Sequence, residues 1–210
     1  MTLRPTPTTT ANTRSRIIRA AEKLFSEKGF QAMTMREVTE LAQVNLAAIN
    51  YHFGSKSALI HEVIGTHVNP INQERRRQLK TLQLHYQAQP IPVELIFDSL
   101  MRPLFKHAAK GKFPQLVGRA MAEPSKFMQA MHKEFFAELS AQYMQELQRS
   151  CPHLNGETVT YRFFLAVSTM IGTIIDQVRW ETLFGSKLDR TKLDRVVEEL
   201  VQFIAAGFKQ

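Results

Sequence analysis

Residues 34–56 constrain the fold of this chain more than any other stretch. Thr34 followed three residues later by Glu37 forms a capping box, which predicts the start of a helix. That helix has one apolar stripe, at spacings of three and four, made of Met35, Val38, Leu41 and Ala42. Residues 43–45 then form a tight turn, and Asn45 can cap a second helix that ends before Gly54.

The second helix buries one side against the first through Ile49 and Phe53, which lie four residues apart. Two short helices joined by a turn of this length are typical of a helix-turn-helix, in which the second helix reads DNA. A preceding helix from Thr13 or Arg14 to Lys28 braces the pair, and Gly29 ends it as a left-handed residue. Its predicted inner stripe is Ile17, Ala20, Ala21, Leu24 and Phe25.

The rest of the chain also has the composition of helices. Of its 210 residues 44% are hydrophobic, and the alternation at period two that marks strands is nearly absent. We therefore expect an all-α protein with a disordered arm at 1–12, a three-helix DNA-binding domain at 13–66 and a second helical domain at 67–210. The helix that begins near Ser55 should break or bend at Pro70. The later helices should span 92–109, 113–122, 125–149, 157–183 and 192–208.

The formal net charge of +8 is unevenly distributed. Residues 1–90 contain 12 Lys and Arg against 6 acids, whereas the remaining residues contain 15 against 13. The basic excess therefore lies beside the helix-turn-helix, where DNA phosphates would bind, although a basic surface that serves only solubility explains the charge too. The consecutive Arg75, Arg76 and Arg77 either touch DNA or, as we prefer, form a solvated face or pair with acids.

In the region of the helix-turn-helix the chain resembles the TetR family of bacterial one-component regulators. The resemblance covers roughly residues 16–64, in the segments AAEKLFSEKGF, MTMREVTELAQV and NYHFGSKSALI. Gln43 and Ala47 stand where many members carry Gly, and Asn50 stands where many carry an aromatic residue. These departures cost about 1 kcal/mol or even favour a helix, so the fold should survive them. Base preference, however, does not carry over from the family.

The resemblance implies phosphate contacts from Thr34, Tyr51, His52 and Lys56. Asn50 is the best candidate for base reading, because its amide can pair with N7 and N6 of adenine. Ala47 and Ala48 allow close approach to the groove and contact with a thymine methyl. Two alternatives stay open: Asn45 either contacts DNA or only caps its helix, and His52 either contacts phosphate or holds the turn.

The last two long helices carry more apolar surface than a monomer needs. Residues 163–175 are apolar nearly all round, and the final helix has a wide stripe made of Leu193, Val196, Val197, Leu200, Val201 and Ile204. The resemblance implies that these helices form a four-helix bundle across a two-fold axis. A homodimer also places two reading heads about 34 Å apart, in successive major grooves.

The middle helices are rich in Met and Phe, which suit adaptable apolar pockets but also ordinary cores. The resemblance implies an effector cavity, and the segment LVGRAMAEPSKFM is similar to a subgroup that responds to fatty acids or acyl-CoA thioesters. Arg119 would then face an acid group, or it forms a surface ion pair instead. The candidate pocket residues are Met101, Phe105, Arg119, Met121, Phe127, Met128 and Met131.

Sequence signatures of enzymes, metal sites and membrane attachment are not found. There is no phosphate-cradling Gly loop and no nucleophile elbow, and His61 and His67, six residues apart, do not share a helix face. We expect no cofactor and no metal. The one cysteine, Cys151, fits a reducing compartment. The run 163–175 is too short to cross a bilayer, and the N-terminus lacks an apolar signal core, so we expect a cytoplasmic protein.

The sequence thus predicts a homodimeric, ligand-responsive transcription regulator. As a repressor, it would bind a palindromic operator in double-stranded DNA and be released by a small apolar effector, such as a fatty acid or acyl-CoA. The alternative is a DNA-binding dimer without small-molecule control, whose DNA binding is either constitutive or regulated by a protein partner. A second domain whose Met and Phe side chains pack into a solid core would favour that alternative.

Overall fold

The computed structural model describes residues 7–108, 113–185 and 190–209, and every regular element in those ranges is a helix. The predicted all-α class is therefore confirmed. The helices form two compact units. The first contains the described residues up to Val68 together with Gln115–Met131, and the second contains Asn69–Pro114 and the described residues from His132 onward. Residues 115–131 thus group with the helix-turn-helix, whereas the prediction placed them in the second domain at 67–210.

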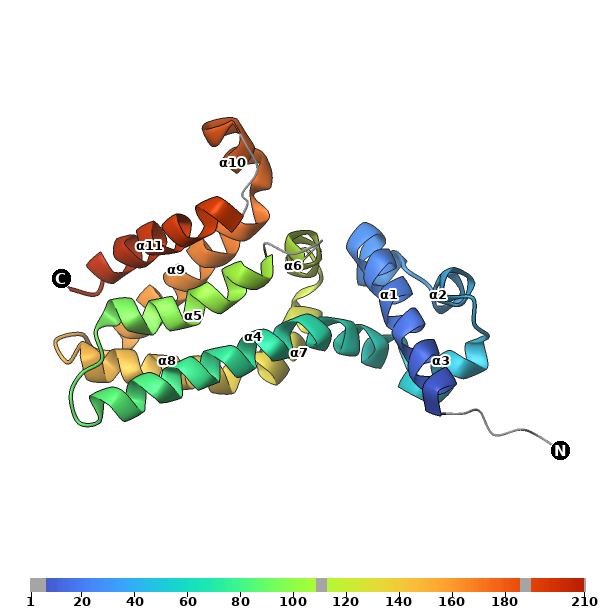
Figure 1. Cartoon of the computed structure of the whole chain (residues 1–210), viewed down its shortest axis with the longest axis horizontal. Coiled ribbons are helices and arrows are strands. Elements are labelled where there is room, and N and C mark those ends of the chain that lie inside the picture. The colour runs from blue at the N-terminus through green and yellow to red at the C-terminus, as the bar shows by residue number, and fades with distance from the viewer. Residues whose placement is uncertain (1–6, 109–112, 186–189, 210) are drawn as a thin grey trace. The chain divides into compact units, whose positions relative to one another are not determined.

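The first unit is built on α1 (Pro7–Ala32), α2 (Met35–Ala42), α3 (Leu46–Phe53) and the beginning of α4 (Figure 1). The predicted inner stripe of α1 is buried throughout. Gly29, with φ 81° and ψ 176°, interrupts α1 where an end was expected. The start was placed too late, because residues 7–12 are helical rather than disordered; Pro7 suits a first helical position. Residues 1–6 of the predicted arm lie outside the described residues.

Helix α4 runs without a break from Lys56 to Tyr86, so the break expected at Pro70 does not occur. Proline inside a helix removes the hydrogen bond to the carbonyl four residues earlier and costs about 3 kcal/mol. Val68 and Ile71, on either side of Pro70, are both buried, and packing of this kind offsets the loss. The division between the two units falls inside this helix, between Val68 and Asn69.

The second unit packs α5 (Val93–Ala108) against α8 (Ala137–Ser150), α9 (Gly156–Ile175) and α11 (Arg190–Ala206). The predicted stripe of α11 is mostly buried, through Leu193, Val197, Leu200, Val201 and Ile204. Cys151 ends α8 and is itself buried, and this burial raises the pKa of its thiol.

Two segments that were predicted as single helices are pairs. Residues 125–149 contain α7 (Ser125–Phe135) and α8, separated at Phe136 with φ −125° and ψ −26°. Residues 157–183 contain α9 and α10 (Gln177–Phe184), separated at Asp176 with φ −88° and ψ 59°. The short helix α6 (Phe113–Met121) lies close to its predicted range.

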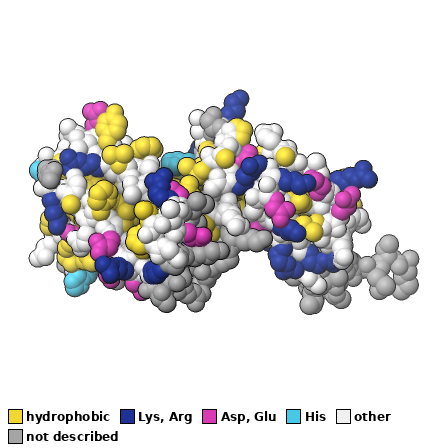
Figure 2. Space-filling model, turned by 90° about the horizontal axis from the view of Figure 1, so that it is seen from above, with side chains coloured by type: hydrophobic (Ala, Val, Ile, Leu, Met, Phe, Trp, Pro, Cys, Tyr) yellow, Lys and Arg dark blue, Asp and Glu magenta, His cyan; other side chains and the backbone are white. Residues whose placement is uncertain are grey.

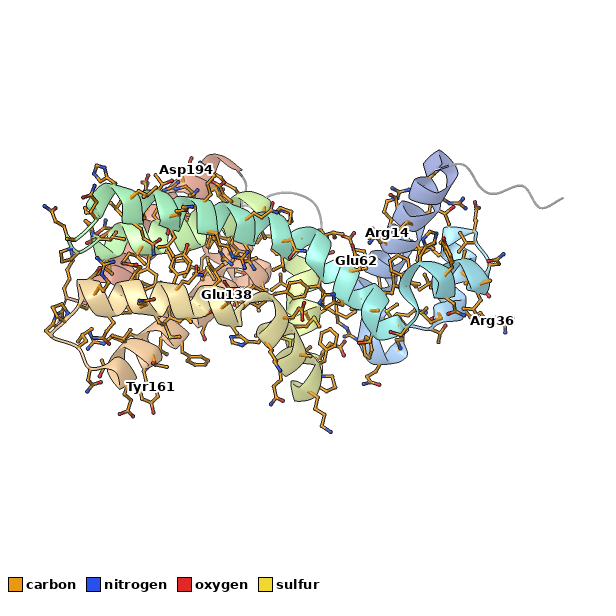
Figure 3. The ribbon with its side chains drawn as sticks, turned by 90° about the horizontal axis from the view of Figure 1, so that it is seen from below. Arg14, Arg36, Glu62, Glu138, Tyr161 and Asp194 are labelled. Atoms are coloured by element: carbon orange, nitrogen blue, oxygen red, sulfur yellow. The ribbon has the colours of Figure 1, made fainter. Side chains whose placement is uncertain are left out.

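Helix α9 has two apolar faces, of which one is covered. Val159, Phe163, Ala166, Met170 and Ile174 are buried in the second unit, whereas Tyr161, Phe164, Leu165 and Ile175 are exposed. Tyr161 points away from the neighbouring helices (Figure 3). By length and composition α9 is the one helix among the described residues that could cross a membrane, but a core helix of a soluble protein passes the same test.

Candidate nucleic-acid interface

The N-terminus of α2 is held by the predicted capping box. The Glu37 backbone N–H donates to Thr34 Oγ1 at 3.2 Å, and the Thr34 backbone N–H donates to Glu37 Oε2 at 2.8 Å. Lys28 Nζ lies 2.5 Å from Glu37 Oε1, and this bond, with those from Thr34, lowers the pKa of Glu37 to about 2. The first turn of α2 is therefore fixed, and its remaining N–H groups suit an anionic oxygen.

The turn between α2 and α3 contains a residue in the left-handed conformation. Gln43 has φ 52° and ψ 50°, a geometry that costs an L-residue about 1–2 kcal/mol. Its N–H and that of Val44 bond to carbonyls of α2, and Arg16 donates from Nη2 to the Gln43 carbonyl at 2.8 Å. These bonds hold a strained turn without the glycine that many relatives place there.

Helix α3 is anchored on one side and open on the other. Asn45 Oδ1 accepts a hydrogen bond from the Ala48 N–H at 2.8 Å, so the predicted cap is present. Ile49 is fully buried against α1 and α2, whereas Phe53 is only half-buried. The exposed face consists of Asn45, Leu46, Ala47, Asn50 and Tyr51, with Ala48 half-buried at its edge.

Aromatic rings and cations frame the end of α3. Tyr51 is 83% exposed, and its ring meets that of His52 edge-on, with centroids 5.2 Å apart. The Arg14 guanidinium lies 5.5 Å from the Phe53 ring centroid and also pairs with Glu62 of α4 at 2.7 Å (Figure 3). The predicted phosphate contacts Tyr51 and His52 thus border one exposed helix end. The half-buried position of His52 suits a structural role as well.

Lys56, in the first turn of α4, lies over a ring of α1. Its Nζ is 4.8 Å from the Phe30 ring centroid and 3.4 Å from the Gln31 carbonyl oxygen. The preceding Ser55 caps α4 by accepting the Ala58 N–H at 3.1 Å. All eight predicted DNA-binding residues therefore lie on the first unit, at the start of α2, on α3 and at the start of α4.

Cations on two helices were not predicted as part of the interface from the sequence. Arg36, on the first turn of α2, is exposed and makes only a loose pair with Glu40 at 3.4 Å. On α1, Arg16, Arg19 and Lys23 border a shallow hollow of about 270 Å³, together with the unexpectedly exposed Leu41. These three residues recur at spacings of three and four outside the inner stripe of α1, and this pattern could have predicted a basic face on the helix. Figure 2 shows Lys and Arg side chains, in dark blue, on the surface of this unit.

Arg119, predicted either to face an effector acid or to form an ion pair, forms an ion pair within the first unit. Its Nη2 donates to the Lys28 carbonyl oxygen, and its Nε lies 3.8 Å from Glu123 Oε1. The same Glu123 oxygen accepts the Phe30 N–H at 2.7 Å. We call Lys28, Phe30, Arg119 and Glu123 the clasp. A Cβ at Gly29 would overlap the ends of the Arg119 and Glu123 side chains, which would have to shift, and the positive φ of 81° favours glycine there as well.

The other predicted pocket residues do not gather in one unit. Met101 and Phe105 are fully buried in α5 of the second unit, whereas Met121, Phe127, Met128 and Met131 belong to the first. Met121 is exposed, and the Phe127 ring lies 5.3 Å from Phe30 and 6.1 Å from Phe25. Phe127 therefore packs onto α1, which sequence reasoning did not anticipate.

Two protein-family models match the chain. The model of the bacterial regulatory proteins of the tetR family matches residues 17–63. The model of the tetracyclin repressor-like C-terminal domain matches residues 98–207, which is more than half of the chain.

Relatives and solved structures agree with these models. The transcriptional repressor NicS of Pseudomonas putida is 33% identical over 43% of this chain and 42% of its own length. UidR of Escherichia coli is 38% identical over 25% of this chain and 26% of its own length, so the chain spans only about a quarter of that relative.

Among solved structures, NalD of Pseudomonas aeruginosa has a TM-score of 0.61 at 20% identity, covering 94% of this chain and 97% of NalD. FadR of Bacillus halodurans, a fatty acid degradation regulator, has a TM-score of 0.61 at 15% identity and covers 98% of both chains. Both likenesses concern the fold.

Proposed function

This chain belongs to the TetR family of DNA-binding transcription regulators, which are not enzymes, and on that premise we propose that it is a homodimeric repressor released by a small apolar effector. It acts in the cytoplasm on a palindromic operator. The observation that carries the proposal is the exposed face of α3, a helix that follows the capped start of α2 and precedes the capped start of α4 in the chain.

The chemistry of this face supports DNA binding. Asn50 is exposed and offers an amide for adenine, while Ala47 leaves room for close approach to the groove. Thr34, Tyr51, His52 and Lys56 surround it with donors and a positive charge for phosphates, and Arg36 adds a further cation. A single short helix makes few base contacts, so a second copy of the head is needed for a specific site.

The uncovered face of α9 supports the dimer. Tyr161, Phe164 and Leu165 are large, apolar and exposed, and Phe203 of α11 is exposed as well. Exposed apolar patches of this kind mark interaction surfaces in soluble proteins. Pairing of α9 and α11 with the same helices of a second subunit would bury them. That use of α9 also accounts for its apolar composition without a membrane.

The clasp supports a route from effector to DNA. Residues 115–131 dock on α1 through the clasp and through Phe127, while α7 continues into the second unit as His132–Phe135. Helix α4 likewise carries residues of both units. An effector that prefers one arrangement of these helices would shift the spacing of the two heads and lower operator affinity by its differential affinity.

A second candidate is a DNA-binding dimer without small-molecule control. Met101 and Phe105 are fully buried, as side chains of a solid core are, and this favours the second candidate. One experiment separates the two: binding of the purified protein to the DNA upstream of its own gene, at several salt concentrations, with fatty acids and acyl-CoA added. Release by one ligand supports the repressor. Tight binding that no ligand alters supports the second candidate, and binding no tighter than to random DNA contradicts both at this operator.

A further inference from the structure

Arg75 of α4 is a buried cation in the second unit. Its residue surface is only 4% exposed. Nε donates to the Leu100 carbonyl at 2.7 Å, one terminal nitrogen donates to Asn72 Oδ1 at 3.2 Å, and the other reaches Met170 Sδ at 3.8 Å. Burial lowers the pKa of Arg75 to about 10, which still leaves the guanidinium charged at neutral pH. The positive charge therefore persists among buried side chains, of which Asn72 and Tyr143 are polar.

No carboxylate of the described residues pairs with this charge. Two other arginines of the second unit offer a contrast: Arg77 pairs with Glu74, and Arg102 pairs with Asp98. Removing a charge from water is unfavourable unless the charge is paired and fully hydrogen-bonded. One terminal nitrogen of Arg75 meets only a thioether, which is a weak acceptor. The guanidinium thus has donors to spare for an anion.

The surroundings of Arg75 suit a molecule with one acid group and an apolar body. Ile71 and Leu79 lie one turn away on the same helix, and both are buried. Met101 follows the Leu100 carbonyl that accepts from Arg75, and Met170 lies across from it on α9. Methionine side chains are flexible and can give way to a ligand.

We infer that Arg75 anchors the carboxylate of the effector, which is an apolar monocarboxylic acid with a free acid group. This inference rests on the proposed effector control and deepens it. The carboxylate takes the place of the Met170 sulfur and forms a bidentate pair with the guanidinium, the geometry for which arginine is suited. The apolar body lies among the Met and Phe side chains of the same unit. A thioester lacks the negative charge at this end of the chain and is not held in this way.

Arg75 is also connected to the end of α7. Asn72, which accepts from Arg75, donates from its amide to the Phe135 carbonyl at 2.7 Å. Phe135 is the last residue of α7, the helix whose opposite half carries Phe127 onto α1. A carboxylate that competes with Asn72 for the guanidinium therefore acts on a helix that extends into the DNA-binding unit.

Calorimetric titration of the full-length protein tests the inference. The probes are straight-chain carboxylates of six to sixteen carbons, each compared with the alcohol and the CoA thioester of the same chain length. We expect at least one carboxylate to bind roughly tenfold or more tightly than its alcohol, since hydrogen bonds to charged groups have about that worth. Arg75→Met should abolish this preference, and Arg75→Lys should retain part of it. Arg76→Met, which removes an exposed charge one position away, should bind as the wild type does.

Two results would overturn the anchor. One is that no carboxylate binds more tightly than its alcohol, and the other is that the preference survives in Arg75→Met. If Arg75→Met does not fold, the wild-type comparison and Arg75→Lys still decide. Operator binding without ligand is measured on the same preparations. Its persistence alongside either result limits the failure to the anchor, whereas its absence from the wild type contradicts the proposed function itself.

Discussion

The carboxylate of Glu123 accepts a hydrogen bond from the backbone N–H of Phe30 at 2.7 Å, across 93 residues of sequence. The bond forms because Gly29 interrupts α1 and leaves the N–H beyond it without the usual helical acceptor. Arg119 completes the clasp by reaching both Glu123 and the Lys28 carbonyl. The end of α1 is thus held by side chains from a distant part of the chain.

Replacing Glu123 with Ala should lower the free energy of unfolding by about 1–3 kcal/mol, because the Phe30 N–H loses its acceptor and the Arg119 guanidinium loses its ion pair. Urea denaturation measures this loss. Glu40→Ala is the matched control, since its exposed pair with Arg36 should change stability by about 0.5 kcal/mol at most. Equal effects of the two substitutions would mean that the clasp adds nothing to the fold.

Gly29→Ala should destabilise the protein more than Gly54→Ala. Both glycines have positive φ, 81° and 73°, so each substitution carries a backbone cost of about 1 kcal/mol. A Cβ at Gly54 meets nothing within 4 Å, whereas one at Gly29 overlaps Arg119 and Glu123. We expect an additional loss of about 1 kcal/mol or more at Gly29 in thermal unfolding. Similar melting temperatures would show that the clasp side chains move aside at no cost.

Glu37 should contribute stability that disappears in acid. Its pKa is lowered to about 2 by Lys28 and Thr34, so the folded state keeps this carboxylate charged where the unfolded chain takes up a proton. The contribution is present above the usual carboxyl pKa of 4.5 and is lost as the pH falls toward 2. The difference between wild type and Glu37→Gln in urea midpoint should therefore be largest at neutral pH and shrink in acid. A constant difference over that range would contradict this assignment.

Asn50→Ala and Lys56→Ala should weaken operator binding in different ways. Loss of a base contact at Asn50 should cost about 1–3 kcal/mol and relax the preference at one base pair. Loss of a phosphate contact at Lys56 should weaken binding equally on all sequences and reduce the slope of log K against log salt by about 0.9. Fluorescence anisotropy on operator and random DNA distinguishes them. Equal losses of Asn50→Ala on both DNAs would exclude base reading by Asn50.

Leu165→Lys should dissociate the dimer, because it places a charge on the uncovered face of α9. Leu84→Lys is the control, since Leu84 lies on α4 and is 67% exposed, against 60% for Leu165. Analytical ultracentrifugation should find a monomer for the first variant and a dimer for the second. A dimer in both cases would place the subunit contact elsewhere.

The helix-turn-helix could be predicted nearly residue by residue because its signals are local. The capping box at Thr34, the Asn45 cap and Gly29 each act within a few residues and are all present. Leu41 was expected inside because of its spacing, but it borders the basic hollow on α1. Helical periodicity predicts the side of a helix on which a residue lies, but only packing decides how far a neighbouring helix buries that residue.

The break between α7 and α8 depended on a contact that no local pattern contains. Phe136 interrupts the run between α7 and α8 without a proline or glycine, beside the carbonyl of Phe135 that Asn72 binds from α4. At Asp176 a signal was available, since its side chain accepts the Arg179 N–H as an ordinary cap does. Pro70 led to the opposite error, because a break was predicted there and α4 continues through it. For Arg75 the preferred prediction of a solvated face was wrong, because its side chain is buried while Arg76 and Arg77 are exposed.

The buried Cys151 has a practical consequence for measuring motion in this protein. It is the one cysteine of the chain, and its thiol is enclosed and poorly ionised, so maleimide dyes should leave it untouched in the native state. A single cysteine introduced at an exposed position outside the predicted DNA contacts, such as Glu27 of α1, would then carry a fluorophore without removing the native thiol. Two such labels in a dimer would turn the separation of the reading heads into an optical signal.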